Sequence, residues 1–128
     1  MDTCSILKNS KTVAVVGISD KPERDSGRIA FFLKEKGYDV VGIHPLLTEV
    51  HGIKVYKNLK DIPHQIDLVD IFLSSDKVDG IVDDIISIKP KYCWFQLGVV
   101  NNEAASRLEN ADIPTIQNKC VAIEYRFC

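Results

Sequence analysis

The residues best suited to chemistry lie where a run of β-branched residues meets a glycine near the start of the chain. A strand expected over residues 12–17 ends on Gly17, a polar loop follows, and Ser26 opens a helical pattern. A glycine at such a turn lets the backbone bend sharply and come close to a ligand. The free N–H groups of the first helical turn, together with the helix dipole, favour an anion. This unit therefore predicts a phosphate site for a nucleotide-type ligand.

The loop departs from two common phosphate-binding motifs. Residue 19 is Ser, so the loop is not a GxGxxG fingerprint, and the Gly-Lys-Ser/Thr of a Walker A loop does not occur. The second expected strand, 39–43, ends in His44 and Pro45, whereas a dinucleotide site usually has Asp or Glu there for the ribose hydroxyl. These residues weigh against NAD as the ligand, and an NAD(P)-type binder stays as an alternative.

Other catalytic and metal-binding signatures are missing from the sequence. It has no HExxH and no Gly-x-Ser-x-Gly, and its four cysteines, at positions 4, 93, 120 and 128, form no CxxC pair. We therefore predict no catalytic set and no metal site. Cys93 lies in an apolar run and is expected in the core, and free thiols are the default for an intracellular chain.

Length and charge narrow the class of protein. The 128 residues fit one domain, 1–128, and a net charge of -2 provides no basic field for nucleic acid. No apolar run approaches the ~20 residues that cross a bilayer, and the first residues do not resemble a signal peptide. A cytoplasmic protein is therefore expected.

Strand-like and helix-like segments alternate along the chain. The expected strands span residues 12–17, 39–43, 53–56, 67–73, 92–97 and 113–116. The expected helices span 26–36, 75–89 and 102–110, with a single turn at 58–63. This order predicts an α/β fold, a three-layer, doubly wound, mainly parallel Rossmann-like sheet whose first, second and fourth strands are neighbours. Ligands of such sheets bind beyond the carboxyl ends of the strands, here the loops after Gly17, Ile43, Leu73 and Leu97.

Taken together, segments along nearly the whole chain resemble the CoA-binding protein family. These proteins are small stand-alone relatives of the CoA-binding domain of succinyl-CoA synthetase α subunits. The segments that carry the resemblance are 13–19, 21–24, 38–45, 56–63, 67–72, 94–99, 102–105, 118–120 and 123–124. Two departures stand out: His44 replaces an Asn that is common before the proline, and Leu73-Ser74-Ser75 replaces arginines after the fourth strand.

The resemblance implies a bound coenzyme A or acyl-CoA. It places Gly17, Ser19, Lys21 and Arg24 along the phosphates with Ser26 at the helix start, Val41, His44 and Pro45 beside the nucleotide, Gln96, Leu97 and Gly98 on the pantetheine side, and Asn118 and Cys120 in a closing segment.

A CoA-binding protein without evident catalytic machinery is the function that the sequence favours. Lys21, Arg24 and Arg28 are the cations available near the first helix. The alternatives are an enzyme or enzyme subunit acting on acyl-CoA, the NAD(P)-type binder, and an interaction module that senses CoA or redox state. Cys120 is the one candidate nucleophile, and we hypothesise that it forms a mixed disulfide with the CoA thiol. The sequence does not indicate a protein partner.

Overall fold

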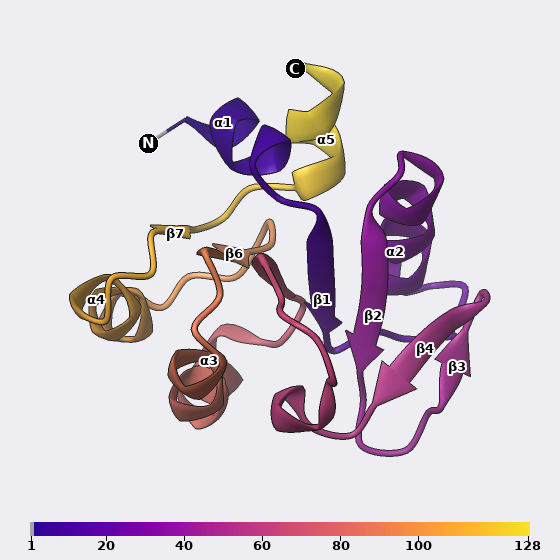
Figure 1. Ribbon diagram of the computed structural model, residues 1–128, viewed down its shortest axis with the longest axis horizontal. Helices are drawn as coiled ribbons and strands as arrows, with labels where there is room; N and C mark the ends of the chain where they lie inside the picture. Colours follow the sequence, from indigo (N-terminus) through magenta and orange to yellow (C-terminus); the bar gives the residue numbers. More distant parts are fainter. Residues whose placement is uncertain (1) are drawn as a thin grey trace.

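Seven strands form one sheet with helices on both faces in the computed structural model, which describes residues 2–128 (Figure 1). The strands are β1 Thr12–Val16, β2 Asp39–Ile43, β3 Glu49–Val50, β4 Ile53–Tyr56, β5 Leu68–Ile71, β6 Tyr92–Phe95 and β7 Thr115–Ile116. The helices are α1 Thr3–Lys8, α2 Asp25–Glu35, α3 Val82–Ile88, α4 Asn102–Asn110 and α5 Val121–Arg126, with 3₁₀ turns η1 Leu59–Asp61 and η2 Ser75–Ile81. The predicted α/β, mainly parallel, Rossmann-like architecture is confirmed.

The strand order β3-β4-β2-β1-β5-β6-β7 puts β1 in the centre of the sheet. It pairs in parallel with β2 on one side and with β5 on the other, as the predicted crossovers require. β3 alone pairs antiparallel, with β4. The chain leaves β1 toward α2 and leaves β5 toward α3, and these two helices pack on opposite faces of the sheet. The winding direction therefore reverses between β1 and β5, where doubly wound sheets form their ligand crevice.

Both faces of the sheet are buried, and alternate residues of each strand serve the two cores. Val13 and Val15 of β1 pack with α1, α2 and α5, whereas Ala14 and Val16 pack with α3 and α4. Trp94 of β6 and Leu68 of β5 belong to the same core as Val13 and Val15 and are fully buried. The period of two along a strand produces this division. It explains why the central strands are apolar throughout.

Local signals predicted some helix boundaries and missed others. The helix expected over 102–110 is present as α4, and the Asn101 side chain caps it by accepting a hydrogen bond from the Ala104 N–H at 3.0 Å. The helix expected over 75–89 instead begins as the 3₁₀ turn η2 and becomes α-helical only at Val82. The Ser75 hydroxyl accepts from the Val100 N–H, so it holds the loop after β6 and does not cap a helix. The short helices α1 and α5 were not predicted.

The expectation that all four cysteines are free thiols is wrong for two of them. Cys4 and Cys128 form a disulfide, with Cα atoms 5.5 Å apart, because α1 and α5 pack side by side (Figure 1). The cross-link closes a loop over a sequence separation of 124 residues. Chain-entropy arguments give such a loop roughly 5 kcal/mol of stabilisation. Cys93 and Cys120 are free, and Cys93 is buried as expected.

A carboxyl group is buried in the middle of the sheet. Asp70 of β5 is fully buried between Val15 of β1 and Trp94 of β6, and neither carboxylate oxygen has a hydrogen-bond partner within residues 2–128. Burial raises the pKa of Asp70 well above its ordinary value, because desolvation penalises the charged form. The pKa of the Cys93 thiol is also raised, first by burial and then by the neighbouring Asp70 charge. Cys93 is therefore an unreactive thiol.

Replacing Asp70 with Asn tests this carboxyl. The pKa of Asp70 is higher in the native state than in the unfolded state. At a pH between these two pKa values, the native state therefore binds an additional proton at Asp70. The wild-type free energy of unfolding then falls as pH rises through that window, at about 1.4 kcal/mol per pH unit from this group. The Asp70→Asn variant has no such proton, so its stability relative to the wild type increases with pH above about 4. Urea unfolding of both proteins at a series of pH values measures the difference. Parallel pH profiles for the two proteins contradict the assignment.

Candidate functional site

A pocket of about 760 Å³ opens at the carboxyl ends of β1, β2 and β5, the edge that the topology indicates. Loops after these three strands form its walls, and the first turn of α2 forms one end. The lining residues are Gly17, Ile18, Ser19, Lys21, Glu23, Arg24, Asp25, Ser26, His44, Pro45, Phe72, Leu73, Ser74 and Lys77. Of the predicted site residues, seven are therefore brought together here: Gly17, Ser19, Lys21, Arg24, Ser26, His44 and Pro45.

Gly17 is required by the fold itself. Its φ of +84° is a conformation that L side chains rarely adopt, and a Cβ there would lie 2.8 Å from the Phe72 carbonyl oxygen. Its N–H donates to the Ile43 carbonyl oxygen at 3.0 Å, which ties the turn to the end of β2. The turn at Gly17 therefore packs against the neighbouring strand ends, and glycine is needed there with or without a ligand.

Hydrogen bonds within the loop after Gly17 hold its conformation. The Ser19 hydroxyl accepts from the Lys21 N–H at 3.1 Å, and the Arg24 N–H donates to the Lys21 carbonyl at 3.0 Å. The Ser19 carbonyl oxygen lies so close to Gly27 in α2 that a Cβ at Gly27 would collide with it. Gly27 is therefore needed at this point of α2. Its function is to let this loop pack tightly against α2.

His44 performs a structural task with one ring nitrogen. Its Nδ1 accepts from the backbone N–H groups of Leu46 and Leu47, at 3.0 and 3.1 Å. A nitrogen that accepts two N–H bonds carries no proton, so in the neutral ring the proton is on Nε2. His44 thus shapes the turn after β2 and leaves Nε2–H as a donor on a half-buried side chain.

The charges at the pocket differ in part from the sequence expectation. Lys21 and Arg24 line it, and none of the ion pairs found within residues 2–128 involves them. Arg28 does not line the pocket, because it pairs with Asp25 and donates to the Pro22 carbonyl. Lys77 of η2 lines the pocket at the β5 end and likewise makes no ion pair in that part of the chain. Lys77 follows the fourth predicted strand in the sequence, and this position indicates a place at the site. The sequence-based prediction did not include it.

The predicted residues near the end of β6 form a second group, outside the pocket lining. The Asn118 side-chain oxygen accepts from the Gly98 N–H at 2.8 Å, and the Gln96 side-chain oxygen accepts from the Val121 N–H at 3.1 Å. These bonds hold the segment before α5 against β6. Cys120 is half-buried directly before α5, and Leu97 is 64% exposed at the same edge. Val41, in contrast, is buried in the core and does not line the pocket.

The two groups are neighbours along one edge of the sheet. Ser74 lines the pocket, and the next residue, Ser75, bonds to both Gly98 and Val100 beyond β6. Among residues 2–128, no group of three or more His, Cys, Asp or Glu side chains is arranged to hold a metal ion. The helices of that same range are all too short or too polar to span a membrane.

The chain belongs to the CoA binding domain family, which it matches over residues 11–126. YneT of Bacillus subtilis (strain 168) is 32% identical to it over 120 residues, which are 94% of this chain and 89% of YneT. A solved structure of a hypothetical protein from Pyrococcus horikoshii OT3 superimposes with a TM-score of 0.93 at 35% identity, covering 98% of this chain and 88% of that one.

A larger enzyme contains a related segment. The α subunit of the ADP-forming acetate–CoA ligase II of Pyrococcus furiosus is 36% identical over 61 residues, which are 47% of this chain and 13% of that subunit. The predicted kinship with CoA-binding domains is therefore confirmed at the level of the family.

Two glycines with similar backbone angles separate strain from steric contact at the turn. Gly17 and Gly98 have φ of +84° and +89°, but no atom lies within 4 Å of a Cβ built on Gly98. Gly98→Ala should cost about 1–2 kcal/mol of stability from backbone strain alone. Gly17→Ala adds the collision with Phe72 and should cost at least about 1 kcal/mol more. Urea unfolding measures both variants. Equal losses of stability in the two variants would show that the contact with the Phe72 carbonyl adds no destabilisation.

Proposed function

We propose that this protein binds coenzyme A or an acyl-CoA, with the phosphates in the pocket beside α2 and the pantetheine arm directed toward the end of β6. The observation that carries the proposal is an α2 N-terminus that opens on a large pocket with three cations. No side chain within residues 2–128 caps this helix, so its first N–H groups are available to an anion. Membership of the family supports the same ligand.

The charges suit a ligand with several phosphates. Lys21 and Arg24 approach the pocket from the loop after β1, and Lys77 approaches it from η2 after β5. Glu23 and Asp25 also line it, but Asp25 is neutralised by its pair with Arg28. Arginine and lysine bind phosphate through charge-assisted hydrogen bonds, and Arg can do so with two parallel N–H groups. A pyrophosphate with a further phosphate matches these three cations better than a singly charged ligand.

The rest of the edge offers a path for a long, mostly uncharged arm. Leu97 is a large apolar side chain that is exposed beyond β6, and it follows the pocket along the edge through Ser74 and Ser75. Cys120 lies directly before α5, whose first residue, Val121, bonds to Gln96 just after β6. A mixed disulfide between Cys120 and the CoA thiol stays a prediction of this arrangement. Nothing at the end of β2 supplies the acidic residue that reads a ribose in dinucleotide sites, since His44 and Pro45 occupy that position.

Ligand selectivity tests the proposal directly. Isothermal titration calorimetry should show tighter binding of CoA than of NAD, NADP or ATP. ATP shares the polyphosphate but has no pantetheine, so it reports how much the β6 edge contributes. Binding of NAD as tight as that of CoA, or no binding of CoA, would overturn the assignment.

A pair of arginine variants tests the pocket itself. Arg24→Ala should weaken CoA binding by about 1.5–3 kcal/mol, roughly tenfold to a hundredfold in Kd, because a charge-assisted phosphate contact is lost. Arg126→Ala is the matched control, since Arg126 lies at the end of α5, does not line the pocket and takes part in no ion pair found within residues 2–128. It should leave Kd nearly unchanged. Equal effects of the two substitutions would indicate only the general charge of the surface, and the phosphate position would then be wrong.

A further inference from the structure

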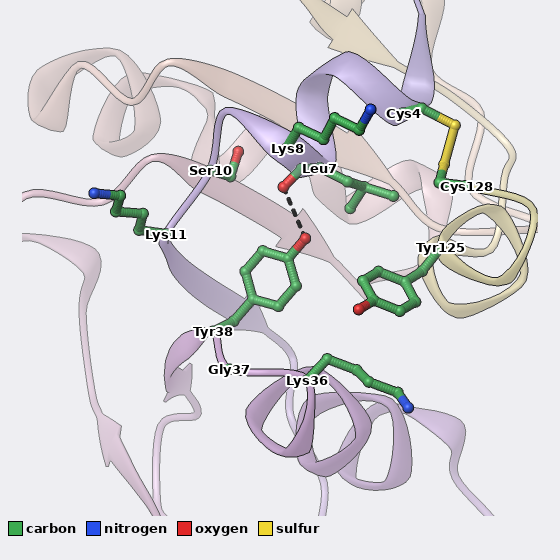
Figure 2. A pocket seen from close by; sticks show the side chains of 10 residues that line it. All are labelled: Cys4, Leu7, Lys8, Ser10, Lys11, Lys36, Gly37, Tyr38, Tyr125 and Cys128. Carbon is green, nitrogen blue, oxygen red and sulfur yellow. Dashed lines mark hydrogen bonds between the residues drawn. A yellow bond between two sulfur atoms is a disulfide. The ribbon is translucent and has the colours of Figure 1, made fainter.

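A second pocket, of about 430 Å³, lies at the amino ends of β1 and β2 (Figure 2). The first pocket lies at the opposite, carboxyl ends of these strands. It is enclosed by α1, the end of α2 and α5. The lining residues are Cys4, Leu7, Lys8, Ser10, Lys11, Lys36, Gly37, Tyr38, Tyr125 and Cys128. The Cys4–Cys128 disulfide is therefore part of the pocket wall, and Figure 2 shows it at one end of the pocket.

The disulfide is accessible to small molecules. Cys128 is exposed and Cys4 is half-buried, so solvent reaches both sulfur-bearing residues. The two residues come from segments at opposite ends of the described chain, and Thr3 donates a hydrogen bond to the Glu124 carboxylate beside them at 2.9 Å. An exposed disulfide is open to attack by a thiolate, which must approach one sulfur atom directly.

The pocket wall is cationic. Lys8 is four residues after Cys4 on α1 and so lies on the same face of that helix, and its side chain runs toward Cys4 in Figure 2. Lys36 and Lys11 also line the pocket, and none of the three takes part in an ion pair found within residues 2–128. The Lys36 ammonium lies over the Phe32 ring, 5.4 Å from its centroid. No lining residue is acidic.

Two of the nearby acids are occupied by other partners. Asp2 accepts hydrogen bonds from the Cys4 N–H and the Ser5 hydroxyl, and Glu124 accepts from Thr3. The Tyr38 hydroxyl donates to the Leu7 carbonyl at 2.7 Å, as Figure 2 shows. The Tyr125 hydroxyl has no hydrogen bond to any part of the chain that the structure describes, so it is a donor available to a ligand.

We propose that this pocket is a docking site for a low-molecular-mass anionic thiol, which undergoes exchange with the Cys4–Cys128 disulfide. The thiolate attacks the sulfur of Cys128, the more exposed of the two residues, and forms a new S–S bond to it. The Cys4–Cys128 bond breaks, and its electron pair leaves with the Cys4 sulfur, which takes up a proton. A second thiol then attacks the mixed disulfide, so that two thiols are oxidised to one small disulfide and the protein is reduced to two cysteine thiols.

Three small thiols of different charge test the proposal on the full-length oxidised protein. These are 3-mercaptopropionate, 2-mercaptoethanol and cysteamine, which carry a carboxylate, no charge and an ammonium group. Iodoacetamide trapping and intact-protein mass spectrometry follow the loss of the disulfide. Each rate constant is divided by that of the same thiol with a neutral small disulfide, which removes differences in intrinsic nucleophilicity. We expect 3-mercaptopropionate to be roughly three- to tenfold faster than 2-mercaptoethanol, and cysteamine to be slower. Equal normalised rates for the three thiols overturn the proposal.

Matched variants separate this pocket from the general charge of the protein. The double variant Lys8→Gln/Lys36→Gln should remove most of the preference for 3-mercaptopropionate. Lys57→Gln and Lys60→Gln, combined in one protein, make the same change of charge outside the pocket lining and should preserve it. Loss of the preference in both double variants shows a general charge effect and contradicts docking in the pocket.

The same assay in a Cys120→Ser background distinguishes sources of the anion. Reduced glutathione offers carboxylates and CoA offers phosphates, and peptide mapping identifies adducts at Cys4 or Cys128. The thiol with the larger normalised rate constant, glutathione or CoA, identifies whether the pocket prefers carboxylate or phosphate. Failure of both to exceed 2-mercaptoethanol after normalisation contradicts the proposal, and this result is independent of CoA binding at the opposite edge of the sheet.

Discussion

Parallel pairing of β1 with both β2 and β5 is the constraint on which the rest of the structure depends. It brings the carboxyl ends of three strands to one edge, where their loops must meet. Because α2 and α3 pack on opposite faces, the chain diverges there and leaves a crevice that side chains of the sheet do not fill. The position of the candidate ligand site therefore follows from strand order, before any individual side chain is considered.

Helix α5 connects the two edges of the sheet. Its first residue, Val121, donates to Gln96 just after β6, and the Trp94 indole N–H donates to the Lys119 carbonyl at 2.8 Å. The chain just beyond its other end is joined to α1 by the disulfide. The segment that closes the candidate CoA site and the disulfide that lines the second pocket thus belong to one short helix and its flanks. These long-range bonds, and not helix propensity, hold a helix of this length in place.

Polar side chains around the candidate site divide into two kinds. His44, Gln96 and Asn118 have their acceptors satisfied by backbone N–H groups, which fixes the turns that carry the pocket. A buried polar group without a partner is costly, so this bond matters most for Gln96, which is only 4% exposed. The exposed cations Lys21, Arg24 and Lys77 do not need a hydrogen-bond partner in the protein, because water solvates them. The rigid wall and the charged groups that face a ligand are therefore supplied by different residues.

The sequence by itself determined the alternation of strands and helices and, to within one residue, the start and end of α2, because these depend on residues only a few positions apart. It also indicated the edge at which the loops converge, since crossover handedness is a general property of L-amino acid chains. Only the tertiary structure decided that Cys4 meets Cys128, that Lys77 reaches the pocket, and that Gln96 and Asn118 bond to backbone. These outcomes depend on which side chains approach one another in space, and neither residue type nor local periodicity encodes that.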